Sequence, residues 1–297
     1  IKMTALSLTI SVPNNFRSEG VLQYYGRDQA GVSEKVSGAG FEKAFWVDGV
    51  PAYFAINFHD DKVSVEADVD ARLKKSRLQF IVNSLVSRVL GLLQPVADFE
   101  SMALEDHILR RTIIETRGLR VPQAVSPWEA LISSVIGQQV SVAAATSMRS
   151  RFIKGMGTIH SSGLFCFPQP KFIAKYNVHE LRNFGISSAK SNTIHSLAVA
   201  IASGELSLEE APSVDSDFEP ISRALLSFKG VGPWTVSNTL LRGYSFLDGS
   251  LHGDMVVRKK IQQLLGKKTL SVSEAEQWLI QYKPWRGLLA AHLWAMR

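Results

Sequence analysis

The sequence has a single cysteine and no long apolar segment. Because Cys166 is the only cysteine among 297 residues, a disulfide within the chain and any zinc or iron–sulfur site with four cysteine ligands are excluded. No run of eighteen or more apolar residues occurs, and the first residues lack the basic and then apolar order of a signal peptide. We therefore expect a soluble, intracellular protein without a membrane partner, in which Cys166 is a small core residue.

Metal-ligand spacing is also missing from the seven histidines, so no metal site is predicted with certainty.

The chain has an uneven distribution of charge. Residues 1–104 carry 11 Lys and Arg against 12 Asp and Glu, whereas residues 105–297 carry 22 against 15. The basic C-terminal two thirds would attract a polyanion such as nucleic acid. Many soluble proteins are mildly basic, however, so the charge alone does not decide the partner.

The N-terminal third has the pattern of an antiparallel sheet followed by a helix. Residues 4–12 alternate polar and apolar side chains, as a half-buried strand does. Three further strand-like runs at 41–48, 51–58 and 62–67 are separated by Asp-Gly and Asp-Asp turn signals, which predicts a meander. Between 76 and 93 the apolar residues recur every three or four positions, as in an amphipathic helix. We predict an α+β domain over residues 1–104.

Everything after about Ser101 has the pattern of helices and turns. Ser126, Pro127 and Glu129 combine an N-cap, a proline at the first helical position and the glutamate of a capping box. Further helices are expected at 141–152, 187–201, 218–226, 235–244, 254–264, 273–282 and 286–296. The predicted fold class is mostly α with an N-terminal α+β domain, in which residues 105–297 form a two-lobed helical bundle.

A turn with two glycines separates two of these helices. The sequence Lys-Gly-Val-Gly-Pro at 229–233 allows positive φ angles, and it lets the backbone N–H groups of Gly230, Val231 and Gly232 approach a ligand closely. A phosphodiester fits such a turn without any base being read. The alternative is a tight elbow between two helices that binds nothing.

Three motifs around this turn resemble one protein family. The glycine turn, followed about twenty residues later by Leu-His-Gly-Asp at 251–254, resembles the helix-hairpin-helix and aspartate of a DNA glycosylase superfamily. Residues 127–132 (Pro-Trp-Glu-Ala-Leu-Ile), 136–145 (Ile-Gly-Gln-Gln-Val-Ser-Val-Ala-Ala-Ala) and 283–286 (Lys-Pro-Trp-Arg) resemble its alkylation-repair branch, the DNA-3-methyladenine glycosylase II type. The resemblance covers about 120–297, and over 1–104 it is only architectural.

The resemblance implies a monofunctional DNA glycosylase of base-excision repair that acts on double-stranded DNA with damaged bases. Such an enzyme flips an alkylated purine, 3-methyladenine above all, out of the duplex and hydrolyses its N-glycosidic bond. Asp254 matches the family's aspartate, which stabilises the positive charge at C1′ and assists the attacking water. An N-cap role for Asp254 is compatible with this, and Asp248 is the nearest rival carboxylate. The alternatives are a glycosylase for deaminated or oxidised bases and a non-catalytic helix-hairpin-helix DNA-binding protein.

The resemblance also assigns the surroundings of the site. Trp234 stands two residues after Gly232, where strand-cleaving members carry a lysine that forms a Schiff base, so the chain is expected to leave the strand intact. Trp234, Tyr282 and Gln138 are implied to surround the flipped base, and Gln139 to fill the gap that it leaves. The alternatives are ordinary buried aromatic residues and glutamines that only cap a loop.

Fewer signals bear on cofactors and partners. Arg258 begins a basic cluster that is expected to face DNA phosphates, although a merely solvated helix face is an equal alternative. No cofactor is expected, but the resemblance leaves open a monovalent cation held by backbone carbonyls of the hairpin. We expect a monomer, cytoplasmic at the nucleoid in a bacterium and nuclear in a eukaryote.

Overall fold

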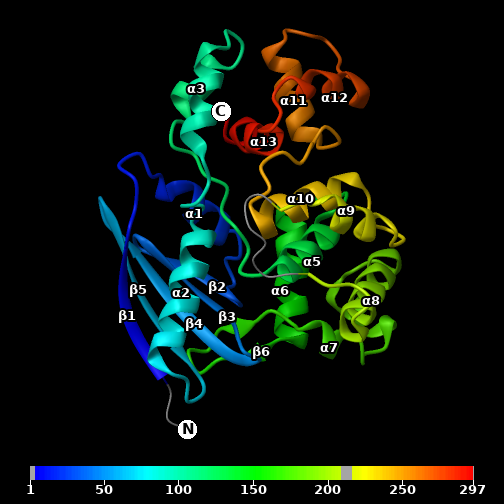
Figure 1. Cartoon of the computed structure of the whole chain (residues 1–297). Coiled ribbons are helices and arrows are strands. Elements are labelled where there is room, and N and C mark those ends of the chain that lie inside the picture. The colour runs from blue at the N-terminus through cyan, green and yellow to red at the C-terminus, as the bar shows by residue number, and fades with distance from the viewer. Residues whose placement is uncertain (1–3, 209–215, 297) are drawn as a thin grey trace.

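The computed structural model describes residues 4–208 and 216–296 and consists of a sheet covered by a helix beside a group of short helices (Figure 1). The five strands pair antiparallel in the order β1-β5-β4-β3-β2. Their bounds are Thr4–Ser11 (β1), Glu34–Ser37 (β2), Gly40–Val47 (β3), Val50–Phe58 (β4) and Lys62–Val69 (β5). The four predicted strands and the meander are confirmed. β2 was not predicted from the sequence.

Two helices pack on this sheet. α2 (Lys75–Val89) lies across one face (Figure 1) and buries most of the apolar residues that the helical spacing indicated. It ends earlier than expected, because Gly91 adopts a positive φ of 68° just beyond it. α1 (Ser18–Tyr25), which contacts β2 and β3, was not predicted from the sequence. Its Tyr25 ring stacks on Phe41 with 4.3 Å between the centroids.

The helical part follows the predicted segments closely. The expected helices correspond to α5 (Pro127–Gly137), α6 (Val142–Met156), α8 (Ser188–Ser203), α9 (Glu219–Leu226), α10 (Pro233–Tyr244), α11 (Met255–Leu264), α12 (Val272–Ile280) and α13 (Arg286–Ala295). Helical segments that the sequence did not predict are α3 (Val96–Glu105), α4 (Arg110–Glu115), α7 (Pro170–Ile173) and the 3-10 helix η1 (Val178–Phe184). The expectation of helix and turn alone after Ser101 is corrected by a short strand pair, β6 (Thr158–Ile159) and β7 (Phe165–Cys166).

Two separate apolar cores confirm the two-lobed bundle. One core lies mainly between α5, α6 and α8, and the other between α3, α4, α11, α12 and α13. Residues 96–104 at the end of the predicted α+β domain contribute Val96 and Phe99 to this second core. α10 belongs to both, since Val236 and Leu240 lie in the first core and Leu241 in the second. Figure 1 shows α10 between the two groups of helices.

A buried cluster of charges joins the sheet to the bundle. The fully buried Lys43 Nζ lies 2.8 Å from Glu34 Oε2 and 2.9 Å from Glu129 Oε1, and Arg149 pairs with both carboxylates. Burial raises the pKa of Glu34, but the attraction of Arg149 and Lys43 outweighs it and lowers this pKa to about 2. Ser126 caps α5 as predicted, but the carboxylate of Glu129 does not complete a capping box, because it is engaged by these two cations.

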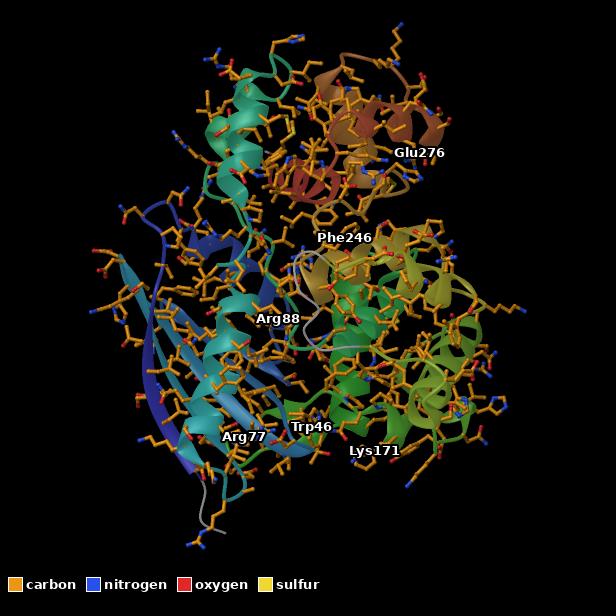
Figure 2. All side chains as sticks on the ribbon, in the orientation of Figure 1. Trp46, Arg77, Arg88, Lys171, Phe246 and Glu276 are labelled. Atoms are coloured by element: carbon orange, nitrogen blue, oxygen red, sulfur yellow. The ribbon has the colours of Figure 1, made fainter. Side chains whose placement is uncertain are left out.

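Further hydrogen bonds cross the same boundary. Trp46 Nε1 donates to the carbonyl oxygen of Phe167 at 2.7 Å, and Arg88 Nη2 donates to that of Val125 at 2.8 Å. Figure 2 shows Trp46 and Arg88 along the side of the α+β domain that faces the bundle.

Cys166 is buried as expected. Within residues 4–208 and 216–296, no helix has both the length and the apolar character needed to cross a bilayer.

Replacement of Lys43 tests the role of the buried cluster. Lys43→Met leaves two buried carboxylates with one cation, so we expect the free energy of unfolding to fall by about 3–5 kcal/mol in urea titrations. Arg77→Ala is the control, because the Arg77–Asp48 pair is exposed and should leave the urea midpoint close to that of the parent. Equal midpoints for the two variants would show that the buried cluster does not stabilise the fold.

Candidate active site

Asp254 is fixed at the start of a helix. It is the N-cap of α11, and its Oδ1 accepts hydrogen bonds from the N–H groups of Val256 at 2.9 Å and Val257 at 3.0 Å. The N-cap role considered from the sequence is therefore confirmed. Because the side chain remains partly exposed, capping does not remove the carboxylate from solvent.

Two tryptophans from other helices complete the hydrogen bonding of this carboxylate. Trp234 Nε1, from the first turn of α10, donates to Asp254 Oδ2 at 3.1 Å, and Trp294 Nε1, from α13, donates to Oδ1 at 3.3 Å. Oδ1 thus accepts three N–H groups and Oδ2 accepts one. Each carboxylate oxygen has two lone pairs, so the three donors on Oδ1 share its two lone pairs, whereas Oδ2 keeps one for a further ligand. No sequence motif indicated this role for Trp294.

Asp248, the rival carboxylate, is engaged elsewhere. Its Oδ1 accepts from Arg286 Nε at 2.8 Å and its Oδ2 from Arg286 Nη2 at 2.9 Å. Both side chains are largely buried in this bidentate pair. Asp248 is therefore paired with a cation, whereas among the described residues no Lys or Arg forms an ion pair with Asp254.

The glycine hairpin links α9 to α10 and has a conformation that requires its first glycine. Gly230 has a φ of 89°, and a Cβ atom there would lie 2.2 Å from Thr193 Oγ1. The Val231 N–H donates to the carbonyl oxygen of Phe228, so it is engaged within the hairpin rather than directed at a ligand, in contrast to our expectation. In the part of the chain that the structure describes, the N–H groups of Gly230 and Gly232 have no acceptor.

Gln138 connects the loop between α5 and α6 to this hairpin. Its Nε2 donates to the carbonyl oxygen of Gly230 at 2.9 Å and to Thr235 Oγ1 at 2.8 Å. Lys190 Nζ, from α8, donates to the carbonyl oxygens of Ile136 at 2.8 Å and Gln138 at 2.7 Å. The structure thus brings Gln138 to the predicted DNA-binding turn and braces it there. Whether it also contacts a flipped base stays a prediction.

Gln139 is the exposed residue at the tip of the same loop. It has a φ of 54°, and the neighbouring Val140 and Val142 are 40% and 61% exposed. A left-handed residue followed by exposed apolar side chains suits a tip that meets another molecule. The wedge role of Gln139 is compatible with this position and stays a prediction.

Tyr282 and Arg258 are less accessible than expected of ligand-contacting residues. Tyr282 is 2% exposed, its hydroxyl donates to Asp106 Oδ2 at 2.9 Å, and its ring packs against Trp278. Burial, followed by the effect of Asp106, raises the pKa of Tyr282. Arg258 is partly buried, and its Nε has no hydrogen-bond partner among the described residues. The base-pocket role of Tyr282 and the phosphate contact of Arg258 stay predictions.

The hairpin carbonyls bear on the question of a cation. Those of Phe228, Lys229 and Gly230 each accept one protein hydrogen bond, from Val231 N, Thr193 Oγ1 and Gln138 Nε2. A carbonyl oxygen has two lone pairs, so each can still coordinate a cation. Binding of a monovalent cation therefore stays a prediction.

A second group of ligand-type side chains lies at the end of β5. His160 Nε2 is 2.8 Å from Asp68 Oδ1 and 3.5 Å from Asp70 Oδ1, a proximity that sequence spacing could not reveal. The Ser162 N–H donates to His160 Nδ1, which leaves Nε2 facing the two carboxylates. His160 Nε2 and Asp68 Oδ1 have no hydrogen-bond partner among the described residues, and the three side chains offer ligand atoms of the kind that hold a metal ion.

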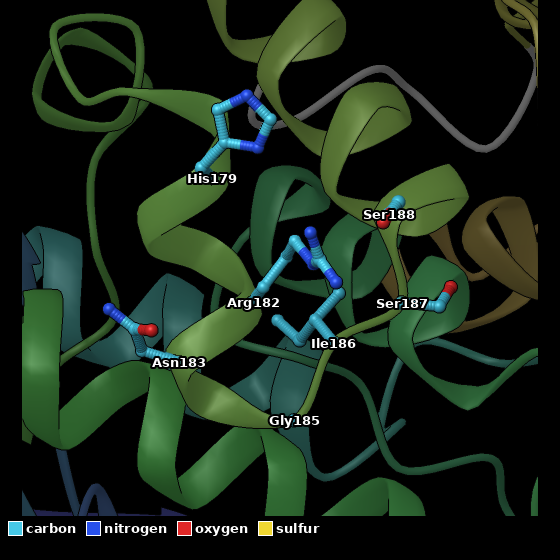
Figure 3. Close-up of a pocket in the computed structure, with 7 residues that line it drawn as sticks. All are labelled: His179, Arg182, Asn183, Gly185, Ile186, Ser187 and Ser188. Carbon is cyan, nitrogen blue, oxygen red and sulfur yellow. The ribbon is translucent and has the colours of Figure 1, made fainter.

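An open hollow lies at the start of α8. Figure 3 shows its lining from η1, the loop that follows it and the start of α8: His179, Arg182, Asn183, Gly185, Ile186, Ser187 and Ser188. None of the site residues predicted from the sequence lines it. The candidate active site is instead the junction of the hairpin, α10, α11 and α13 around Asp254.

Comparisons with known proteins show that the hairpin, α10 and α11 lie within the part of the chain that matches a known family. A family model, the HhH-GPD superfamily base excision DNA repair protein, matches residues 132–279. The DNA-3-methyladenine glycosylase of Bacillus subtilis is 29% identical over 206 residues, which span 66% of this chain and 65% of the relative. The match therefore covers slightly less than two thirds of the relative's own length.

Solved structures extend the similarity to the sheet. The 3-methyladenine DNA glycosylase from Archaeoglobus fulgidus has a TM-score of 0.82 at 19% identity and covers 96% of each chain. This likeness concerns the fold, including the α+β part. The 3-methyladenine DNA glycosylase Mag1 of Schizosaccharomyces pombe, solved in complex with abasic DNA, has a TM-score of 0.58 at 25% identity and covers 66% of this chain and 95% of its own.

The two hairpin glycines should respond differently to substitution. Gly230→Ala places a Cβ against Thr193 at a positive φ, so we expect the free energy of unfolding to fall by more than about 1 kcal/mol. Gly232→Ala is the matched control, because a Cβ added there would meet nothing within 4 Å and its φ of −108° suits alanine. Chemical unfolding of both variants measures the difference. Similar losses at the two positions would contradict this hairpin conformation.

Proposed function

The chain belongs to the HhH-GPD superfamily of base excision DNA repair proteins, and we propose that it is a monofunctional DNA glycosylase that removes alkylated purines of the 3-methyladenine type. The observation that carries this proposal is the Asp254 carboxylate, held by four N–H groups with one oxygen still open. A glycosylase needs one fixed negative charge beside the sugar of an extruded nucleotide.

The proposed reaction is a hydrolysis in which Asp254 acts at C1′. The C1′–N bond breaks and its electron pair leaves with the base, so positive charge develops on the sugar. The carboxylate stabilises this charge, and the free position on Oδ2 accepts the proton of the water that attacks C1′. The products are the free base and an abasic site in an intact strand. No cofactor takes part in these steps.

The chemistry of an alkylated purine suits an aromatic site. Alkylation at N3 or N7 gives the base a formal positive charge, so it leaves as a neutral molecule and needs little acid catalysis. A cationic ring also stacks favourably on an indole face, by about 0.5–2 kcal/mol. Trp234 is partly exposed and adjoins Asp254, so it is the aromatic residue best placed for this contact.

Double-stranded DNA is the proposed partner, bound by a monomer. The two unpaired N–H groups of Gly230 and Gly232 stand at the N-terminus of the twelve-residue helix α10, where the helix dipole favours a phosphate. Two exposed lysines add positive charge that attracts the DNA phosphates. Lys229 directly precedes Gly230 of the hairpin, and Lys259 follows Asp254 by five residues. Gln139, at the tip of the α5–α6 loop, would fill the gap left by the flipped nucleotide.

Two alternatives share parts of this argument. A glycosylase for deaminated or oxidised bases would use the same aspartate with a different base pocket. A non-catalytic DNA-binding protein would use only the hairpin, and it would give no reason for an aspartate with an open oxygen and two indole donors.

Replacement of the carboxylate separates catalysis from binding. Asp254→Asn keeps the shape of the N-cap but removes the negative charge, so we expect release of 3-methyladenine from methylated duplex DNA to fall at least about 100-fold. Binding to a duplex with a stable abasic-site analogue should stay within about threefold, since the hairpin is unchanged. Glu276→Gln, at an exposed acid on α12, is the control and should behave as the parent.

The parent protein should be assayed on alkylated, deaminated and oxidised duplexes side by side. Release of 3-methyladenine that survives in Asp254→Asn would overturn the catalytic assignment. Faster release of uracil, hypoxanthine or 8-oxoguanine would overturn the lesion class but leave the aspartate mechanism standing. DNA binding without release from any duplex would favour the non-catalytic alternative.

The position of Trp234 generates a prediction about strand cleavage. Trp234 has no amine with which to attack C1′, so borohydride should trap no covalent complex between the protein and damaged DNA. A strand-cleaving glycosylase treated in parallel provides the positive control on a denaturing gel. A trapped species that requires borohydride would show that another amine of this chain forms a Schiff base.

A further inference from the structure

A single arginine side chain lies between the α+β domain and the active-site tryptophan. The Arg242 guanidinium carbon is 4.6 Å from the centroid of the Tyr24 ring, which belongs to α1, and 5.5 Å from that of the Trp294 ring, which belongs to α13. These are cation–π distances. Trp294 is the residue whose Nε1 donates to Asp254 Oδ1.

The guanidinium is held by rings and a backbone carbonyl rather than by an acid. Its Nη1 donates to the carbonyl oxygen of Pro122 at 2.9 Å, and among the described residues no carboxylate pairs with it. Burial, with a smaller effect of Arg27, lowers the pKa of Arg242 to about 10, so the side chain is charged at neutral pH. A charged group in this setting depends on the two ring faces for compensation.

The backbone around Arg242 is also fixed by α1. The Tyr25 hydroxyl donates to the carbonyl oxygen of Gln123, whose side-chain Oε1 accepts the Ser245 N–H just beyond α10. The Ala124 N–H donates to the carbonyl oxygen of Arg242 itself. The end of α1 thus supports both the main chain and the side chain of this part of α10.

We propose that Tyr24 and Arg242 are positioning residues for the glycosylase reaction, through which the α+β domain orients Trp294 and, by its indole N–H, the carboxylate of Asp254. This inference rests on the proposed function. The α+β domain would then contribute to the reaction through α1, because Tyr24 of α1 is one of the two rings that hold the Arg242 guanidinium in place. Neither Tyr24 nor Arg242 touches the reacting atoms.

The size of the effect follows from geometry. The Trp294–Asp254 hydrogen bond is 3.3 Å long, so a small rotation of the indole breaks it and leaves Oδ1 with its two helix-capping donors. A misplacement of about 1 Å in a catalytic group can cost about 100-fold in rate. For the partial loss of one of four donors we expect about a tenfold lower rate of base release.

An activity-independent measurement tests the connection itself. The protein has six tryptophans, and the Trp294 indole N–H signal is identified as the one that Trp294→Phe removes from a ¹⁵N–¹H spectrum. Tyr24→Leu, which removes a ring but leaves Arg242 in place, should shift this signal. Tyr24→Phe keeps the ring face and should leave it unchanged, and so should Arg27→Ala, which removes the other cation over Tyr24 at 5.1 Å.

A double-mutant cycle then tests the consequence for catalysis. In single-turnover assays on methylated duplex DNA, Tyr24→Leu should lower the rate of base release about tenfold, with affinity for abasic-analogue DNA unchanged. In the Trp294→Phe background, where the indole donor is already missing, Tyr24→Leu should change the rate less than about twofold. Tyr24→Phe should release base at the parent rate.

The outcomes distinguish failure of this inference from failure of the proposed function. A Trp294 signal that Tyr24→Leu does not move overturns the inference whatever the activity. A shifted signal with an unchanged release rate, or rate losses that multiply in the double variant, also overturns it, because Tyr24 would then act on stability or by another route. If the parent releases no damaged base from any duplex, the proposed function fails instead, and with it the positioning role for that reaction.

Discussion

Everything in the candidate site depends on fixing one carboxylate in place without engaging all of it. Asp254 caps α11 with one oxygen, and the indole groups of α10 and α13 hold the two oxygens from other directions. Because all three helices pack into the second core, which α10 shares with the first, the direction of the carboxylate is set by that second core. The cap that begins a helix is therefore also the group on which the proposed chemistry depends.

The α+β part is attached to the bundle by polar contacts at several separated places. Lys43, Glu34, Glu129 and Arg149 form a closed set of two positive and two negative charges, and Tyr25, Arg88 and Trp46 bond to main-chain carbonyls of the bundle. Hydrogen bonds and ion pairs of this kind are directional, so they define one relative orientation. A defined orientation is what a domain needs if its α1 is to act on residues of α10 and α13.

Much of the fold could be predicted from the sequence, because the signals for it are local. Alternation indicated one strand, strand-like runs between turn signals indicated three more, and helical spacing with cap residues indicated eight of the helices after Ser101 within a few residues. Helix α1 and strand β2 were missed, since each is short and is fixed by contacts with the sheet and not by its own pattern. The capping box predicted at Glu129 failed for the same reason. Its spacing from Ser126 is that of a capping box, but its carboxylate binds Lys43 and Arg149, which are distant in sequence.

In the site, Asp254 and the hairpin could be found from motifs, whereas the roles that depend on side-chain contacts could not. The engagement of Val231 within the hairpin and the bond of Trp294 to Asp254 follow from tertiary packing alone. The burial of Tyr282 has the same origin, because Asp106 and Trp278 approach it from other segments of the chain.

The position of α10 in both cores has a mechanical consequence. The helix begins at the turn proposed to grip the DNA backbone, carries Trp234 in its first turn, and packs its two faces into the two lobes. The lobes therefore cannot move apart like a hinge without shearing the helix from one core. If the proposed roles of the hairpin and Trp234 hold, adaptation to bases of different size falls to side chains around Asp254, and a core substitution in either lobe disturbs the proposed backbone contact and base contact together.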